Sequence, residues 1–346
     1  MAICEPQSRC DRLVLDAEII EDVTVSVPQH PQNVIALVWD FDKTLIPGYM
    51  QDPIFRKFGI DAGTFWAEVN ALPKYLRTTG VTVHPDTAYL NHLLTYVKAG
   101  KMVGLTNALL RELGAEIPFF DGLPDFFEHL RKSAPEGVEI EHYVVSTGLR
   151  PMIEGSKIAD FISGIWASEF IEEAPPPAFD PTMPPTSGKE VTQIAIAYDN
   201  TSKTRALFEI NKGSNKSADI NVNARLAAED RRVPFEQMIY IADGPSDVPA
   251  FSLMRRNGGS TLAVFDPDVK NEKSFEQAEQ LSRDGRIDYY GPADFTEQSA
   301  TSRWLRLKTK RIGEAIVERR QRALREKIGR VPGHIIPDRK TPILTT

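Results

Sequence analysis

The pattern of apolar and polar positions predicts several buried strands, each ending in a polar cluster. Residues 34–39 form a continuous apolar run that leads directly into Asp40 and Asp42. Residues 138–145 and 238–242 predict two further buried strands, and polar residues again follow each of them. Continuous apolar runs are typical of strands buried in parallel sheets, which bind ligands beyond the carboxyl ends of their strands. The pattern therefore predicts an α/β fold built on a parallel sheet.

Apolar residues at helical spacing fill much of the chain between these strands. Residues 48–118 form a helical stretch, within which 89–97 and 109–113 carry the clearest periodicity. Residues 119–131 predict a further amphipathic helix, and residues 203–210 predict another. Alternation of helices with buried strands is the pattern of parallel α/β proteins.

The remaining segments complete the predicted layout. Residues 248–256 predict a helix and 261–265 a fourth strand, which together with strand 238–242 make a compact βαβ unit. Two apolar segments, 161–171 and 191–198, flank a proline-rich stretch and predict a β-hairpin with a long irregular tip. The C-terminal stretch predicts a charged helix over residues 304–330, packed through its apolar positions Trp304, Leu305, Ile312 and Ile316. An irregular tail is expected to follow it.

Composition and charge narrow the class of protein. The 346 residues carry a net charge of −7, which argues against a general nucleic-acid binder because such a protein needs a basic surface. No apolar run approaches the roughly 20 residues that cross a bilayer, and the acidic N-terminus lacks the apolar core of a secretory signal. We therefore expect a cytoplasmic protein with no membrane partner, in which Cys4 and Cys10 are reduced thiols. The sequence does not indicate an oligomeric state.

The polar clusters at the strand ends are expected to converge, because parallel strands present their carboxyl ends at one edge of the sheet. The residues concerned are Asp40, Asp42, Thr44, Ser146, Thr147, Asp243 and Asp247. Carboxylates two residues apart on a strand share a face, and two that lie so close repel each other unless a cation or a shared proton intervenes. The pattern predicts an acidic site at this edge.

This ordered set of motifs resembles the haloacid dehalogenase (HAD) superfamily of phosphohydrolases. The first motif of that superfamily, Asp-x-Asp-x-Thr after an apolar strand, is matched by Asp40, Asp42 and Thr44. Its second, a Ser or Thr at a strand end, is matched by Ser146, and its last acidic pair by Asp243 and Asp247. The match runs from residue 34 to residue 265, and it implies a Rossmann-like core. Two departures are Ala242 and Lys43, where many members carry glycine.

The resemblance implies a role for each matched residue. Asp40 is expected to be the nucleophile, and Asp42 to protonate the leaving oxygen while its backbone carbonyl helps to hold the metal. Asp243 is expected to bind Mg²⁺ directly, and Asp247 to be a second acidic ligand or a support for one, so that the predicted metal set is Asp40, Asp42, Asp243 and Asp247. Ser146 is expected to bind the transferring phosphoryl group, together with Thr44, Thr147 and Gly148.

A lysine is also expected near the phosphoryl group. Lys203 opens a predicted helix, as the lysine of the family commonly does, and Lys212 is the alternative. Lys203 is favoured, although about forty residues separate it from Asp243, which implies an insertion after its helix.

The resemblance also predicts the domain organisation. Residues 1–47 and 119–300 are expected to form the catalytic core, residues 48–118 a helical cap over the site, and residues 301–346 a C-terminal helix and tail. A cap inserted at this point is similar to that of the group containing phosphoserine phosphatase. Its basic residues Arg56, Lys57, Lys74 and Arg77 are candidates for contact with an anionic substrate, though solvent exposure is the simpler expectation for each.

Asp42 indicates which reaction class to expect. Release of an alcohol oxygen needs a proton donor, whereas release of a halide does not, so this aspartate favours a phosphatase or a mutase over a dehalogenase. The expected activity is Mg²⁺-dependent hydrolysis of a small phosphorylated metabolite through an aspartyl-phosphate. The alternatives are a phosphotransferase or phosphomutase with the same residues, and a binding protein that keeps the fold without turnover.

Overall fold

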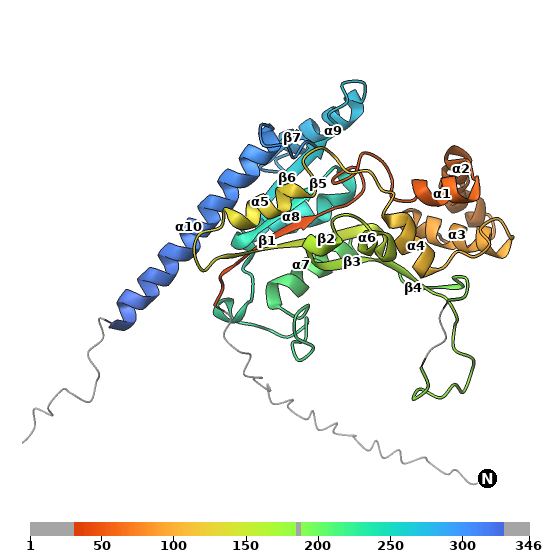
Figure 1. Cartoon of the computed structure of the whole chain (residues 1–346), viewed down its shortest axis with the longest axis horizontal. Coiled ribbons are helices and arrows are strands. Elements are labelled where there is room, and N and C mark those ends of the chain that lie inside the picture. The colour runs from red at the N-terminus through yellow and green to blue at the C-terminus, as the bar shows by residue number, and fades with distance from the viewer. Residues whose placement is uncertain (1–30, 185–187, 329–346) are drawn as a thin grey trace, which may run out of the picture.

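The computed structural model describes residues 31–184 and 188–328, which fold around a seven-stranded sheet (Figure 1). Its strands are β1 (Val34–Trp39), β2 (Glu139–Leu149), β3 (Ile162–Ile171), β4 (Gln193–Ile196), β5 (Met238–Ala242), β6 (Ser260–Phe265) and β7 (Tyr289–Pro292). Their order in the sheet is β4-β3-β2-β1-β5-β6-β7. Every neighbouring pair is parallel except β3 and β4. The predicted α/β fold with a Rossmann-like parallel-sheet core is confirmed.

Strand β1 lies at the centre of the sheet and is buried on both faces. It pairs with β2 on one side and with β5 on the other. The strands β2 to β4 are therefore added on one side of β1 and the strands β5 to β7 on the other, so the strand order reverses at β1. Its side chains alternate between two hydrophobic cores: Ile35, Leu37 and Trp39 enter one, and Val34, Ala36 and Val38 enter the other. This two-sided burial explains the continuous apolar run, and the reversal point is where open α/β sheets bind ligands.

Helices cover both faces of the sheet. On the side of Trp39 lie α5 (Asp125–Lys132) and the long α10 (Ala300–Ile328), which contribute Phe127 and Leu305 to that core. The other core receives side chains from α7 (Ser202–Lys212), α8 (Val248–Arg256) and α9 (Glu272–Arg283). The result is a sheet between two helical layers. The predicted packing of α10 is confirmed, since Leu305, Ile312 and Ile316 are buried and Trp304 stacks on Tyr289.

A group of helices between β1 and β2 lies beyond one end of the sheet (Figure 1). It consists of α1 (Asp52–Phe58), α2 (Ala62–Arg77), α3 (Ala88–Lys98) and α4 (Asn107–Gly114). The helical stretch expected over residues 48–118 is therefore confirmed. Phe65 of α2 and Leu93 of α3 belong to the same hydrophobic cluster as Trp39, so this group packs continuously with the core. The division of the chain into a core and a cap stays a prediction.

Helix α4 approaches α6 (Arg150–Glu154) closely enough to require glycine. A β-carbon added at Gly114 would overlap the backbone carbonyl of Met152, and one added at Gly155 would overlap that of Arg111. The two glycines thus allow the helices to pack backbone against backbone.

Some element boundaries differ from those expected. Strand β2 continues through Ser146, Thr147 and Gly148, which were expected to follow it, and α5 begins only at Asp125. Helix α9 and strand β7 were not predicted. The short 3₁₀ helices are η1 (Pro85–Thr87), η2 (Ala159–Phe161), η3 (Ala228–Asp230), η4 (Phe235–Gln237) and η5 (Pro245–Asp247). The hairpin of β3 and β4 is confirmed as an antiparallel pair.

Some predictions concern residues outside the described ranges. Cys4, Cys10 and the tail after residue 328 lie there. Within the described ranges, none of the helices combines the length and the apolar character needed to cross a membrane. A cytoplasmic location stays a prediction.

Candidate active site

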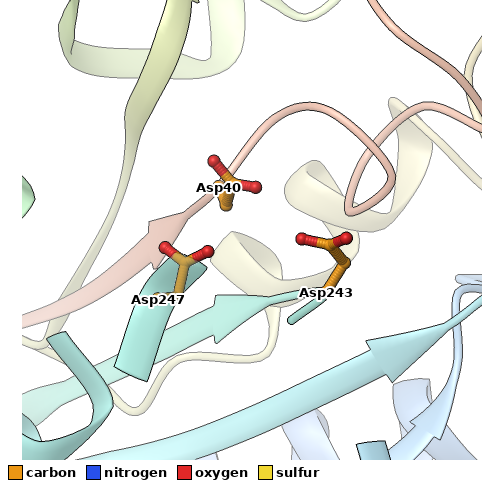
Figure 2. Close-up of side chains that lie close together, drawn as sticks. All are labelled: Asp40, Asp243 and Asp247. Atoms are coloured by element: carbon orange, nitrogen blue, oxygen red, sulfur yellow. The ribbon is translucent and has the colours of Figure 1, made fainter. Parts of the chain in front are cut away.

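Three aspartates from separate segments meet at the carboxyl ends of the central strands. Asp40 directly follows β1, and its N–H donates to the carbonyl of Ile241 in β5 at 2.8 Å. Asp243 directly follows β5, and Asp247 is the last residue of η5. Figure 2 shows the three carboxylates pointing into one space, and one oxygen of each lies within 4.8 Å of the others. The convergence follows from the parallel pairing of β1 with β5, which aligns their ends.

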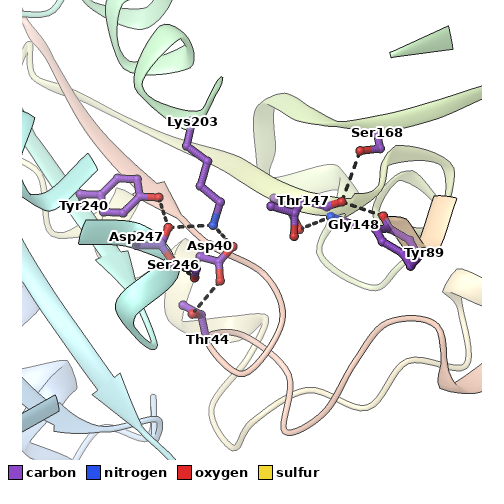
Figure 3. A network of polar contacts seen from close by, with 11 residues as sticks. Asp40, Thr44, Tyr89, Thr147, Gly148, Ser168, Lys203, Tyr240, Ser246 and Asp247 are labelled. Atoms are coloured by element: carbon purple, nitrogen blue, oxygen red, sulfur yellow. Dashed lines mark hydrogen bonds and ion pairs between the residues drawn. The ribbon is translucent and has the colours of Figure 1, made fainter. Parts of the chain in front are cut away.

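Lys203 lies between two of these carboxylates (Figure 3). Its ammonium donates to Asp40 Oδ1 at 2.8 Å and to Asp247 Oδ1 at 2.7 Å, and the residue is 1% exposed. Lys212 instead donates to the backbone carbonyls of Val222 and Ala224. The structure therefore brings Lys203, and not Lys212, to the acidic cluster.

Asp247 and Asp243 have different surroundings. Asp247 is fully buried, and its carboxylate accepts hydrogen bonds from Lys203, from the Tyr240 hydroxyl at 2.5 Å and from the Ser246 hydroxyl at 2.8 Å. The carboxylate of Asp243 is partly exposed and accepts no hydrogen bond from the described residues. Asp247 is thus suited to hold Lys203 in place, whereas Asp243 remains available to a ligand.

Burial and mutual repulsion raise the pKa values of the acidic groups. Burial, opposed in part by Lys203 and reinforced by Asp247, raises the pKa of Asp40 to about 6. Burial and the nearby charges of Asp40 and Asp247 raise the pKa of Asp243 to about 7. Burial and the charge of Asp40 raise the pKa of Asp42 to about 8. For Lys203, burial lowers the pKa, but the charges of Asp247 and Asp40 outweigh the effect of burial, so the net pKa rises.

This donor set fits a hard divalent cation. Mg²⁺ prefers carboxylate oxygens and binds through a few of them together with substrate phosphate and water. The carboxylates of Asp40 and Asp243 repel each other, and the charges of Lys203 and Lys43 offset this only in part. That of Asp243 accepts no hydrogen bond from the described residues. The carboxylate of Asp42 is not part of the three-aspartate cluster, so its predicted metal contact would run through its backbone carbonyl.

The loop after β1 places the other residues of the first motif. Thr44 is fully buried, and its hydroxyl lies 3.5 Å from Asp40 Oδ2. Asp42 Oδ1 accepts a hydrogen bond from the N–H of Met50 at 2.9 Å. Lys43, between them, adopts a left-handed backbone with φ of 59°, which is uncommon outside glycine, asparagine and aspartate.

The end of β2 provides the Ser146 segment. The Ser146 hydroxyl accepts a hydrogen bond from the N–H of Gly148 at 3.0 Å. The carbonyl of Thr147 accepts hydrogen bonds from the Tyr89 hydroxyl at 2.7 Å and the Ser168 hydroxyl at 3.3 Å (Figure 3). These contacts join the end of β2 to α3 and β3.

A cavity of about 520 Å³ opens over the cluster. The predicted site residues that line it are Asp40, Asp42, Ser146, Thr147, Lys203 and Asp243. Thr44, Gly148 and Asp247 are not on its wall but contact residues that are: Thr44 contacts Asp40, Gly148 contacts Ser146, and Asp247 contacts Lys203.

Several residues on this cavity were not predicted. The group between β1 and β2 contributes Tyr49, Trp66, Asp86 and Tyr89 to its wall. Aromatic residues at helical spacing are more often part of a core, so the sequence carried no signal that they face a cavity. Tyr240, which supports Asp247, reads as a core residue of a buried strand for the same reason.

Comparison with known proteins places the chain in a family. No family model matches it. It is 36% identical over 283 residues to an uncharacterized protein of Borreliella burgdorferi, and the match covers 79% of this chain and 96% of that relative. The chain therefore belongs to the same protein family as the Borreliella protein.

Solved structures with a related architecture bear the names of HAD-family hydrolases and phosphoserine phosphatases. A HAD family hydrolase from Salmonella enterica serovar Typhi is 16% identical, with 70% of this chain and 66% of that chain covered and a TM-score of 0.44. A phosphoserine phosphatase described as a phospho-aspartyl intermediate analogue is 15% identical, with 80% and 99% covered and a TM-score of 0.44. At these values the likeness is loose, and the chemistry of this chain has to come from its own residues.

Proposed function

We propose that this protein is a Mg²⁺-dependent phosphatase of the HAD type that hydrolyses a small phosphorylated metabolite through an aspartyl-phosphate. The observation that carries the proposal is the meeting of Asp40, Asp243, Asp247 and Lys203 at the carboxyl end of the sheet, under a cavity. These four residues also match motifs of the HAD superfamily, and they follow one another along the chain in the same order as in those motifs.

The first half of the reaction transfers the phosphoryl group to the protein. A carboxylate oxygen of Asp40 attacks phosphorus, and the bond from phosphorus to the leaving alcohol oxygen breaks. Asp42, two residues further along the same loop and on the same cavity wall, gives its proton to that oxygen. Lys203 holds the other oxygen of Asp40 and so fixes the attacking group.

The second half returns the protein to its starting state. Asp42 takes a proton from a water molecule, whose oxygen attacks phosphorus of the aspartyl-phosphate. The bond from phosphorus to Asp40 breaks, inorganic phosphate leaves and the carboxylate is restored. The Ser146 hydroxyl, on the same wall, is placed to donate to a phosphoryl oxygen in both steps.

A bound Mg²⁺, held by Asp40, Asp243 and the backbone carbonyl of Asp42, would supply positive charge that lets an anionic nucleophile approach an anionic phosphate. Residues 48–118 would act as a cap that excludes water and contacts the leaving group. The partner is then a small phosphorylated molecule.

The test is release of phosphate from para-nitrophenyl phosphate with Mg²⁺, with EDTA in its place, and with the Asp40→Asn variant. We expect activity only in the wild-type protein with Mg²⁺. The matched control is Asp219→Asn, since Asp219 is an exposed aspartate outside the cavity wall. Equal activity in Asp40→Asn would refute the nucleophile, and inactivity of the wild-type protein on a panel of phosphate esters would favour a binding protein. Transfer of the phosphoryl group to an added alcohol instead of water would indicate a phosphotransferase or mutase.

A further inference from the structure

Three aromatic side chains line the cavity on the side formed by residues 48–118. Tyr49, Trp66 and Tyr89 all line it, and their rings form a continuous row. The ring centroids of Tyr49 and Trp66 lie 5.3 Å apart, and those of Trp66 and Tyr89 lie 5.9 Å apart. The faces of such rings attract cations. The ammonium of Lys43 lies at the edge of this row, where it donates to the Tyr49 hydroxyl at 2.6 Å and is 4.2 Å from the centroid of its ring.

The charged groups on the cavity wall leave no cation for a second anionic group of the substrate. Within the described part of the chain, the basic residues that line the cavity are Lys43 and Lys203. Lys203 is bound to two carboxylates, and Lys43 lies beside Asp42 and Asp243, at the end of the cavity where the phosphate would bind.

The basic residues of the region 48–118 that were candidates for contact with an anionic substrate lie elsewhere. Arg56, Lys57, Lys74 and Arg77 are not on the cavity wall, and Arg56 pairs with Glu116 at 3.5 Å. A carboxylate on the leaving group would therefore meet aromatic rings and neutral polar groups, among them the Trp66 N–H and the amides of Gln51 and Asn70, but no basic side chain from this region. The lack of a positive partner is unfavourable for a desolvated charge.

One carboxylate on this wall belongs neither to the three-aspartate cluster nor to the first motif. Asp86, in η1, lines the cavity, and its side chain is 27% exposed. Its nearest basic group among the described residues is His84, whose Nδ1 lies 3.9 Å from Asp86 Oδ2. Asp86 is thus an acceptor that can pair with a cation entering along the aromatic row.

We propose that the substrate is the phosphate ester of a small amino alcohol, with an ammonium group and no carboxylate on the leaving group. The ammonium pairs with Asp86 and packs on the faces of Trp66 and Tyr89, while the phosphate lies over Asp40. This inference rests on the proposed phosphatase function and adds the class of its substrate.

The experiment compares three phosphate esters that differ by one group. O-phosphoethanolamine carries the ammonium, O-phosphoserine adds a carboxylate to it, and 2-hydroxyethyl phosphate replaces the ammonium with a hydroxyl. We expect kcat/KM for O-phosphoethanolamine to exceed that for each of the other two by about tenfold, the size of one modest charge interaction. The Asp86→Asn variant should lose most of the preference over 2-hydroxyethyl phosphate, and Asp219→Asn should keep it.

The outcomes separate this inference from the function on which it rests. Hydrolysis of para-nitrophenyl phosphate with equal or better use of O-phosphoserine or 2-hydroxyethyl phosphate would overturn the substrate class and leave the phosphatase standing. An unchanged preference in Asp86→Asn would overturn the role of that carboxylate. Absence of hydrolysis of every ester, including the aryl phosphate, would overturn both.

Discussion

The ammonium of Lys203 lies 2.8 Å from a carboxylate oxygen of Asp40, a residue 163 positions earlier in the chain. The same ammonium bonds Asp247 at 2.7 Å, so the first turn of α7 is tied to the end of β1 and to η5. All three side chains are at least nine-tenths buried. The contact fixes the orientation of the proposed nucleophile before any substrate binds.

Removal of this cation is expected to cost both stability and activity. Lys203→Met leaves two buried carboxylates without their partner, and breaking a buried ion pair typically lowers the free energy of unfolding by about 3–5 kcal/mol. Urea unfolding of wild type and variant measures the difference. Lys212→Met is the matched control, because Lys212 lies in the same helix and bonds only backbone carbonyls in the described structure. Equal losses in both variants would contradict a special role for Lys203.

Binding of Mg²⁺ is expected to stabilise the fold through Asp243. At a cation concentration of about 100 Kd, binding to the folded state alone adds about 2.7 kcal/mol to the free energy of unfolding. Thermal unfolding with and without Mg²⁺ should show this rise in the wild-type protein and in Asp219→Asn. The rise should be largely absent in Asp243→Asn, and its persistence there would place the cation elsewhere.

Lys43 is expected to bind the substrate anion at a position where glycine would be less strained. A left-handed backbone costs a residue other than glycine about 1 kcal/mol, so Lys43→Gly relieves strain while removing the charge. We expect KM for para-nitrophenyl phosphate to rise about tenfold. The free energy of unfolding should stay within about 0.5 kcal/mol of wild type, because loss of the hydrogen bond to the Tyr49 hydroxyl and the greater freedom of glycine in the unfolded chain offset the relief of strain. A fall in stability with unchanged KM would show a structural role instead.

Because of His142, the free energy of unfolding is expected to decrease as the pH is lowered. Trp39 Nε1 donates to His142 Nδ1 at 3.2 Å, so the ring proton is on Nε2, which faces the carbonyl of Phe127 at 3.3 Å. Burial, together with the charge of Arg131, lowers the pKa of His142 to about 3 from its ordinary value of 6.5. Protonation therefore favours the unfolded chain, and the stability present above pH 6.5 is lost as the pH falls below it.

The size of this effect can be isolated with a variant. One protonation contributes about 1.4 kcal/mol per pH unit below the unfolded pKa, or about 2 kcal/mol between pH 7 and pH 5. Urea unfolding at the two pH values should show that much less pH dependence in His142→Gln than in the wild-type protein. His129→Gln, which changes an exposed histidine on α5, should behave as wild type. The same pH dependence in all three proteins would contradict the assignment.

The close approach of α4 and α6 is expected to make Gly155 intolerant of a side chain. A β-carbon there would overlap the backbone carbonyl of Arg111, so Gly155→Ala should lower the free energy of unfolding by about 1–3 kcal/mol. Gly63→Ala is the contrasting change, since its β-carbon would make only an ordinary contact in the first turn of α2. Because glycine weakens helices, Gly63→Ala should raise stability by about 0.5–1 kcal/mol. Equal effects from the two changes would contradict the close packing.

The chain by itself determined the elements whose signals are local. The apolar run of residues 34–39 predicts β1, because burial on both faces of a parallel sheet demands apolar residues at every position. The carboxylates after β1 and β5 could be predicted to meet, because parallel strands share a carboxyl edge. Strand β7 could not be predicted, since it is four residues long and contains a proline, and a short edge strand has little pattern of its own.

Only the tertiary structure decided which distant side chains complete the site. Lys203 and Lys212 lie on one helix, and it is the packing of α7 against the sheet that turns the first toward Asp40 and the second toward a loop. Likewise, Trp66 and Tyr89 have the spacing of core residues, but the placement of their helices beyond the sheet puts them on the cavity wall. Contacts between residues far apart in the chain depend on how whole helices and strands pack, and a local sequence pattern does not predict that packing.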